Sequence, residues 1–167
     1  MKKLLFFAFI MIAFTAGTFA QVTASATGTA EIVAPIAIAN AVDMNFGNVA
    51  EAGAGTVILD PAGTRTTTGS VTLPAITGTV TAASFTVTGT SGYTYTITLP
   101  STDYTITRTA GAETMIVNTF TSNPSGTGTL TGGSETLNVG ATLNVAAGQV
   151  PGTYTNATGF DVTVNYN

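Results

Sequence analysis

The chain has 167 residues with four Lys or Arg, eight Asp or Glu, and no Cys, His or Trp. So few basic residues exclude nucleic acid as an expected partner, because phosphate binding needs clustered Lys and Arg. Without cysteine the fold cannot rest on disulfides. Apolar residues make up 44% of the chain, too many for a disordered polypeptide.

The first twenty residues are typical of a cleaved signal peptide. Lys2 and Lys3 precede an apolar run from Leu4 to Gly17, and the small-residue segment 18–20 ends at Ala20. The run is about 14 residues long, shorter than the roughly 18 to 20 residues that span a bilayer. We therefore expect an exported protein that begins at Gln21, with no membrane span in the mature chain.

The mature chain, residues 21–167, has the length of a single domain. Its only basic residues are Arg65 and Arg108. With eight acidic residues, its formal charge is −6. Both lysines of the sequence lie in the predicted signal peptide. Lysine isopeptide crosslinks are therefore excluded, and mechanical strength has to come from backbone pairing.

The first mature segment alternates over an unusual length. Polar residues Thr23, Ser25, Thr27, Thr29 and Glu31 lie between small or apolar ones: Val22, Ala24, Ala26, Gly28, Ala30, Ile32, Ala34, Ile36 and Ile38. The pattern predicts one long strand, or two strands bent near Pro35. Segment 21–34 is either the first strand of its own domain or a donor strand for another molecule, presented by Val22, Ala24, Ala26, Gly28, Ala30 and Ile32.

Threonine alternates with Val, Ile, Phe and Tyr through the middle of the chain, as in half-buried strands. We predict a hairpin over 84–99, with its turn at Ser91–Gly92 and its end set by Pro100. Further strands are predicted at Thr56–Leu59, Ser70–Leu73, Tyr104–Thr107 and Glu113–Thr121.

The last third of the chain has two more alternating runs, Leu137–Val145 and Phe160–Tyr166, separated by a turn over 148–153. Leu137-Asn138-Val139 recurs as Leu143-Asn144-Val145, and we interpret the two as parts of one β element. Short strands at this spacing predict a single antiparallel β-sandwich. Strand parity places six residues in one shared core: Phe85, Val87, Tyr95, Ile97, Val162 and Val164.

The mature chain has no His, Cys or Lys, the residues that most often transfer protons near neutral pH or activate a nucleophile in enzymes. A pair of carboxylates, as in glycosidases, could still come from Asp43, Glu51, Asp60, Asp103, Glu113, Glu135 and Asp161. Scattered acids are more often solvated surface charge, so we expect no enzyme.

No cofactor is expected from the remaining motifs. Zinc and copper lack their usual ligands, and calcium in a loop through Asp60 or Asp103 is the open alternative to turn chemistry. The glycine-rich stretches 53–55 and 126–128 precede no predicted helix, which phosphate binding requires.

Four tyrosines allow two interpretations. Tyr93, Tyr95, Tyr104 and Tyr154 could form a stacking platform for sugars. Alternatively they are core residues, because Tyr93 and Tyr95 share strand parity with Ile97 and Leu99. The second interpretation is favoured.

Two short motifs resemble the spore coat protein U and archaic chaperone–usher pilin group. One is the Asn-Phe-Gly element within Met44–Asn48, and the other joins Gly152-Thr153-Tyr154 to the strand Phe160–Tyr166. The middle of the chain resembles the related DUF4402 family at 85–89 and 137–145. The residues that carry the resemblance are Asn45, Phe46, Gly47, Gly152, Tyr154, Val162, Val164 and Tyr166.

The resemblance implies an immunoglobulin-like sandwich that lacks one strand and is completed by the amino-terminal extension of the next subunit. It also implies a periplasmic chaperone and an outer-membrane usher as partners, although the cysteine that pilins often carry before the Asn-Phe-Gly element is absent here. The expected function is a structural subunit of a bacterial pilus or surface fibre, located in the periplasm, at the cell surface or in an extracellular fibre.

Two alternatives stay open. One is a secreted carbohydrate-binding or adhesive module. The other is an amyloid-like matrix protein, which the low charge favours and the lack of clear repeats disfavours.

Overall fold

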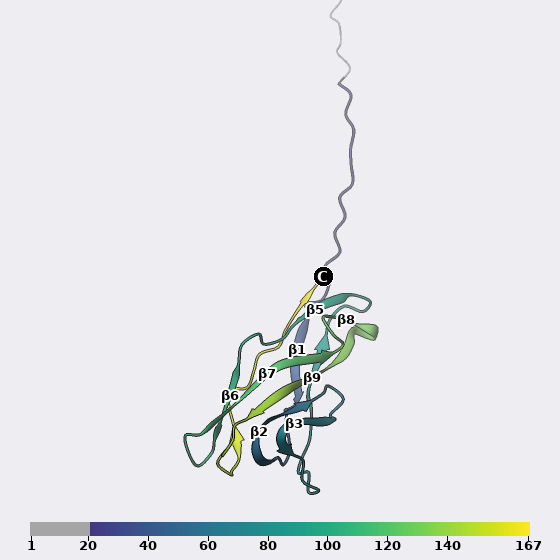
Figure 1. Cartoon of the computed structure of the whole chain (residues 1–167). Helices are drawn as coiled ribbons and strands as arrows, with labels where there is room; N and C mark the ends of the chain where they lie inside the picture. Colours follow the sequence, from purple (N-terminus) through teal and green to yellow (C-terminus); the bar gives the residue numbers. More distant parts are fainter. Residues whose placement is uncertain (1–20) are drawn as a thin grey trace, which may run out of the picture. The chain divides into compact units, whose positions relative to one another are not determined.

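The computed structural model describes residues 21–167, so the predicted signal peptide at 1–20 lies outside the described residues. Residues from Val33 to Asn167 form one folded unit, which contains every strand in the described part of the chain (Figure 1). Residues 21–36 carry no strand.

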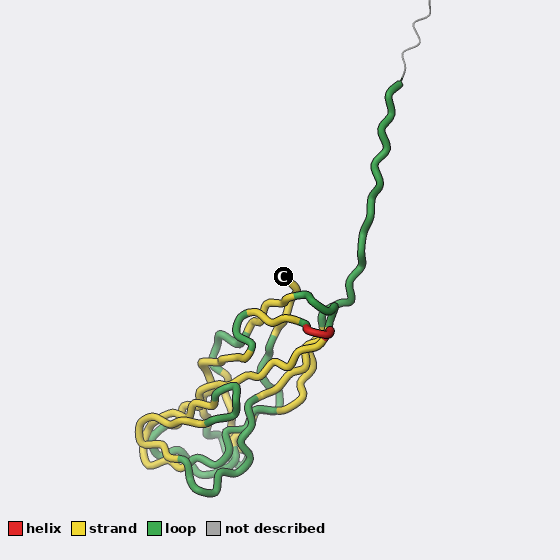
Figure 2. The backbone as a smooth tube through the Cα atoms, turned by 90° about the vertical axis from the view of Figure 1, so that its right-hand side faces the viewer, coloured by secondary structure: helices red, strands yellow, loops and turns green. Residues whose placement is uncertain are grey.

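The regular structure is almost entirely β (Figure 2). A single short 3₁₀ helix, η1 (Thr131–Gly133), interrupts the strands of the described chain. In chain order the strands are β1 (Ala37–Val42), β2 (Ala50–Leu59), β3 (Arg65–Thr72), β4 (Ala83–Thr88), β5 (Thr94–Thr98), β6 (Tyr104–Arg108), β7 (Thr114–Asn123), β8 (Thr127–Thr129), β9 (Ser134–Val145), β10 (Tyr154–Thr155) and β11 (Thr163–Tyr166).

The larger sheet is organised around β9. Its strand order is β1-β4-β9-β7-β6-β10, and all the pairings are antiparallel. Along one edge of β9, β4 pairs with residues 134–139 and β2 pairs with residues 141–145. Strand β3 then pairs with β2 alone.

The smaller sheet has three strands in the order β11-β5-β8. Its inward residues Tyr95 and Val164 share a hydrophobic cluster with Val87, Leu137 and Val139 of the larger sheet. Two antiparallel sheets therefore pack face to face, which confirms the predicted all-β sandwich.

The core has two connected parts. The cluster between the two sheets contains Ala83, Val87, Tyr95, Leu130, Leu137, Val139 and Val164. The second cluster lies under β2 and β3 and contains Phe46, Val57, Leu59, Val71, Val117, Ala141, Leu143 and Val145. All six predicted core residues belong to the first cluster or pack against it, so this prediction is confirmed.

The predicted hairpin over 84–99 is wrong. Strand β4 pairs with β1 and β9, whereas β5 pairs with β8 and β11 in the other sheet. The connecting segment crosses between the sheets, and the N–H groups of Gly89 and Gly92 donate to the carbonyls of Gly133 and Leu130. Val87 and Tyr95 are both fully buried in the cluster that the sheets share. The prediction that both side chains point into the core was correct. They meet across the core from opposite sheets, however, and not as neighbours on two paired strands.

The other strand boundaries also differ from the predictions in places. The long amino-terminal alternation forms a strand only from Ala37, after Pro35, since a strand needs a partner and only this part pairs with β4. Strand β11 begins at Thr163 rather than at Phe160. Strands β8 and β10 are very short and were not predicted. The repeated Leu-Asn-Val segments do lie within one strand, β9.

A polar link joins the two sheets inside the sandwich. The Tyr95 hydroxyl donates to Oε2 of Glu135 (2.8 Å), and the same oxygen accepts the N–H of Thr129 (2.7 Å). Gly128 lies against the Tyr95 ring, where an added Cβ would collide. Burial, and then Glu135, raise the pKa of Tyr95 above its ordinary value. The link holds β5 and β8 against the start of β9.

Truncation of Val164 to Ala tests the contribution of the last strand to the core. The side chain is 7% exposed and packs in the cluster between the sheets. We expect a loss of about 1 to 4 kcal/mol in the free energy of unfolding, from lost burial and a residual cavity. Chemical denaturation measures it, with the neighbouring exposed Thr163→Ala as control. Equal effects of the two substitutions would contradict the assignment.

Replacement of Tyr95 by Phe tests the polar link. At pH 7 we expect a loss of about 1.5 to 3 kcal/mol, the usual range for a hydrogen bond to a charged group. A raised pKa in the folded state stabilises the protein fully below the unfolded-state value of about 10, and this stabilisation is lost as pH rises beyond it. The wild type should therefore lose more stability than Tyr95→Phe between about pH 9 and 11. Parallel pH profiles would exclude this role.

Candidate functional site

Residues 21–33, here called the arm, carry the predicted donor-strand side chains. None of its residues belongs to a strand. Val22 and Ile32 are 93% and 97% exposed, and Ala24, Ala26, Gly28 and Ala30 are exposed as well. An alternating row of apolar side chains therefore stays in solvent in the single chain, and its donor role stays a prediction.

The edges of β1 and β11 form the second part of the candidate site, here called the seam. Strand β1 is the last strand on one side of the larger sheet, and β11 is the last strand of the smaller sheet. The two strands lie next to each other without a backbone ladder between them. Each therefore has one edge of N–H and C=O groups free to pair with an added strand.

Burial is incomplete along the seam. Five apolar residues within or just before β1 and β11 pack against the shared core but stay half-buried: Ile36, Ile38, Phe160, Val162 and Tyr166. In the middle of the sandwich Leu137 and Val139 are fully buried. A strand laid into the seam would cover these half-buried side chains, which is favourable in proportion to the apolar area removed from water.

The other sheet edges are less suited to a partner strand. Strands β8 and β10 have three and two residues. Strand β3 is longer, but its sequence RTTTGSVT is mostly polar and its first residue is Arg65. Polar, charged or very short edges are the usual protection against unwanted pairing. The seam is the edge region that combines length with apolar lining.

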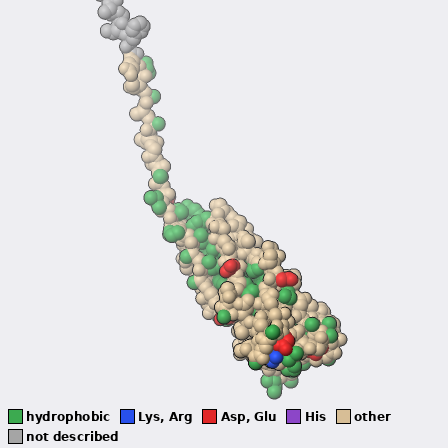
Figure 3. All heavy atoms as spheres, turned by 90° about the vertical axis from the view of Figure 1, so that its left-hand side faces the viewer, with side chains coloured by type: hydrophobic (Ala, Val, Ile, Leu, Met, Phe, Trp, Pro, Cys, Tyr) green, Lys and Arg blue, Asp and Glu red, His purple; other side chains and the backbone are tan. Residues whose placement is uncertain are grey.

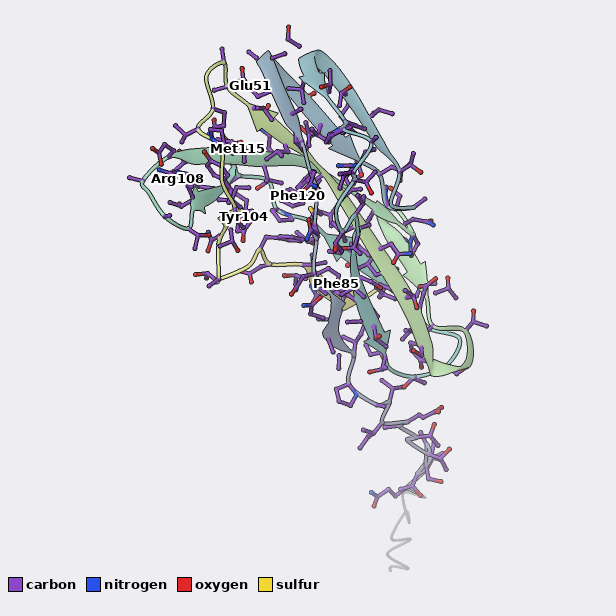
Figure 4. The ribbon with its side chains drawn as sticks, turned by 90° about the horizontal axis from the view of Figure 1, so that it is seen from below. Glu51, Phe85, Tyr104, Arg108, Met115 and Phe120 are labelled. Atoms are coloured by element: carbon purple, nitrogen blue, oxygen red, sulfur yellow. The ribbon has the colours of Figure 1, made fainter. Side chains whose placement is uncertain are left out.

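An aromatic cluster closes one end of the seam. Phe160 contacts Phe120, Tyr104 and Phe85, with ring centroids 4.9, 5.7 and 6.4 Å away. The three partners come from β7, β6 and β4 of the larger sheet (Figure 4). Phe160 therefore attaches the segment before β11 to the larger sheet, although it is not in a strand.

The Asn-Phe-Gly element forms a tight turn that anchors a neighbouring loop. The backbone of Asn45 pairs with Thr81, and the N–H of Gly47 donates to Oδ1 of Asn45 (2.8 Å). Phe46 is buried in the cluster under β2 and β3. The guanidinium of Arg65 donates to the carbonyl oxygens of Phe46 and Asn48. The motif is thus a structural turn, and Arg65, one of the two arginines of residues 21–167, holds it.

The carboxy-terminal motif residues lie apart from that turn. Tyr154 donates its hydroxyl hydrogen to the carbonyl of Val150 (2.6 Å), four residues upstream, and accepts a hydrogen bond from Gln149. Gly152 lies against the Arg108 side chain. Val162, Val164 and Tyr166 all line or underlie the seam. The two motifs therefore do not form one site.

Most of the seven candidate acids are engaged in hydrogen bonds with the surrounding chain, and two of them, Asp103 and Asp161, line one surface pocket beside Tyr104. Six accept hydrogen bonds from separate donors: Asp43 from Asn40, Glu51 from Gly148, Asp60 from Ala62 and Thr64, Asp103 from Asn118, Glu113 from Arg108, and Glu135 from Tyr95 and Thr129. Figure 3 shows acidic side chains standing apart on the face in view. Within residues 21–167, no three His, Cys, Asp or Glu side chains are grouped to hold a metal ion.

The four tyrosines do not form one platform. Tyr95 is fully buried, and Tyr104 donates to the carbonyl of Asn156 in the loop after β10 (3.0 Å). Tyr93 is 42% exposed and packs edge-on against Tyr166. The core interpretation is therefore right for Tyr95 and wrong for Tyr93.

Comparison with known families agrees with this architecture. The family described as "Domain of unknown function (DUF4402)" matches residues 36–166. The chain belongs to this family. The match covers all eleven strands of the DUF4402 domain and begins after Pro35, so the arm precedes it. Neither a curated protein nor a solved structure matches the chain.

Sequence reasoning found the arm, the Asn-Phe-Gly motif (though not its turn structure) and the inward residues of β11. It missed the free edge of β1, Phe160 as the centre of an aromatic cluster, and the binding of Arg65 to the turn. The rarity of arginine after residue 20 was the available signal for Arg65. Among the described residues of the DUF4402 domain and arm, no helix has the length and apolar character to cross a membrane.

Substitution of Gly47 by Ala tests the turn motif. Gly47 has φ +66°, and an added Cβ would collide with the carbonyl oxygen of Thr77 and with Val80. Gly63 has φ +84° with open space around it, so Gly63→Ala reports the backbone cost alone. We expect about 1 to 2 kcal/mol for Gly63→Ala and about 1 to 3 kcal/mol more for Gly47→Ala. Similar losses in urea denaturation would show that the turn is not tightly packed.

Proposed function

We propose that this protein is a non-enzymatic structural subunit of a bacterial surface fibre or pilus, in which the arm of one copy pairs along the seam of the next. The observation that carries the proposal is the coexistence of two incomplete parts in one chain. The arm exposes an alternating apolar row, and the seam leaves an apolar row half-buried beside two unpaired strand edges. Each part offers what the other lacks.

The dimensions suit this assembly. An extended arm of residues 21–33 reaches about 43 Å at roughly 3.3 Å per residue, whereas the six residues of β1 span about 20 Å. One arm can therefore cover the seam of a second copy and leave a few residues to bridge the two domains. Identical subunits joined head to tail in this way form an open chain.

The energetics depend on side-chain burial. Backbone hydrogen bonds contribute about 0.5 to 1.5 kcal/mol each, which roughly offsets the 1 to 2 kcal/mol per residue spent in ordering a free arm. Val22 and Ile32 add about 1.5 to 3 kcal/mol apiece when buried. Ala24, Ala26, Gly28 and Ala30 add little, but their small size lets the added strand lie close to the core.

The cellular setting follows from the same features. The predicted signal peptide directs the chain out of the cytoplasm, and the expected location is the periplasm, the cell surface or an extracellular fibre. An unpaired seam invites uncontrolled association, so a periplasmic chaperone that covers it before assembly, and an outer-membrane usher, are the proposed partners. The resemblance to pilins and spore coat protein U supports these partners.

Arm variants test the proposal in the mature chain, residues 21–167. Deletion of residues 21–33 should give folded monomers, while the intact chain forms a series of oligomers. Gly28→Phe should block assembly, because its bulk points into the seam, whereas Thr27→Phe should be tolerated, because alternate side chains point to opposite faces. Light scattering after size-exclusion chromatography measures the mass, and circular dichroism reports the fold.

A synthetic peptide of residues 21–33 provides the complementary experiment. It should bind the arm-deleted domain and raise its melting temperature, and the same peptide with Gly28→Phe should not. A stable monomeric intact chain together with an unfolded deletion variant would overturn the proposal. That combination would mean that the arm pairs permanently within its own domain.

A further inference from the structure

Three hydrogen bonds meet at the root of the arm, defined here as Ala34 and Pro35. The N–H of Ala34 donates to Oγ1 of Thr90 (2.9 Å), and the Tyr166 hydroxyl donates to the carbonyl of Ala34 (2.9 Å). The same hydroxyl accepts the N–H of Thr90 (2.7 Å). Both backbone polar groups of Ala34 are therefore occupied by the β4–β5 connection and the last strand.

The junction is built closely around the hydroxyl. Gly89 lies directly against it, and a Cβ there would collide with the oxygen. The Tyr166 ring packs on Tyr93 with centroids 5.5 Å apart. Because Ala37 pairs with Thr88, and Ala34 bonds Thr90, the root continues past β4 in the line of β1. The chain therefore enters β1 without reversing direction.

The chemistry of the root also resists a reversal. An arm that filled its own seam would have to turn back before β1, and the favoured two-residue hairpin turn needs positive φ at its central residue or residues. Pro35 is held near φ −65°, and Ala34 is restricted to extended conformations because it precedes proline. Neither residue suits such a turn.

An earlier reversal would leave only the first residues of the arm for β1. With a two-residue turn at 31–32, residue 30 would face residue 33, and only residues 21–26 would come alongside β1. Ile32 would then lie in the turn, and Gly28 and Ala30 would lie beyond the seam. A second copy, in contrast, leaves the register free, so the part of the arm around Gly28 can lie along its six-residue β1. Partner choice thus depends on how the root is held.

We propose that Tyr166 and Thr90 are positioning residues that hold the root straight, so that the arm is directed to a second copy of this chain and not to its own seam. This inference rests on the proposed function, and it goes beyond it by naming what selects assembly over self-closure. The hydroxyl acts on the root through its hydrogen bond to Ala34.

The test uses the mature chain with the double substitution Tyr166→Phe and Thr90→Val, which removes all three hydrogen bonds and keeps the side-chain shapes. Each protein is refolded at one fixed concentration, and its monomer fraction is isolated. A labelled peptide of residues 21–33 then distinguishes open monomers, which bind it, from self-closed monomers, which do not. The double variant should show about a tenfold rise in the ratio of self-closed to open chains, equivalent to about 1.4 kcal/mol.

Two further variants complete the design. Tyr93→Phe removes a neighbouring hydroxyl for which residues 21–167 provide no hydrogen bond, and it should behave as wild type. Tyr166→Phe alone serves if the double variant folds poorly by circular dichroism.

The outcomes separate this inference from the proposed function. One outcome is that deletion of the arm abolishes assembly while the double variant has the same fraction of self-closed monomers as wild type. In that case the positioning role is overturned and the proposed function stands. If assembly survives deletion of the arm, both are overturned. A rise in self-closed monomers in the double variant but not in Tyr93→Phe supports the positioning role.

Discussion

Strand β9 contributes side chains to both core clusters and joins the two halves of the larger sheet. Leu137 and Val139 fill the cluster between the sheets, while Ala141, Leu143 and Val145 fill the cluster under β2 and β3. Its backbone pairs with β4 and β2 on one side and with β7 on the other. A sandwich with no disulfide depends on such shared pairing, because burial and ladder hydrogen bonds have to stabilise it alone.

The seam follows from this arrangement. Strand β9 pairs on both sides, so its inward residues are covered completely, whereas β1 and β11 each pair on one side and their inward residues stay half-buried. The two arginines of residues 21–167 serve the fold elsewhere: Arg65 holds the Asn-Phe-Gly turn, and Arg108 binds Glu113 and lowers the pKa of that carboxyl. Assembly at the seam would therefore depend on backbone pairing and apolar burial.

The candidate site was accessible to sequence analysis only in part. The alternation from Val22 to Ile32 identifies the arm, because a period of two is a local property of the chain. The seam was not predictable, since it depends on which strands end up at sheet edges. The Tyr166 hydroxyl was likewise beyond prediction: its partners Ala34 and Thr90 are 132 and 76 residues away, and no local pattern links them.

By itself the sequence determined the all-β class and the inward parity of Val87, Tyr95 and Val164, because strand period is encoded locally. Only the tertiary structure decided which strands pair. Residues 84–99 have the parity of a hairpin, but the same parity also suits two strands that face each other from opposite sheets. The second arrangement forms because β4 finds its ladder partners in β1 and β9, and β5 finds its own in β8 and β11.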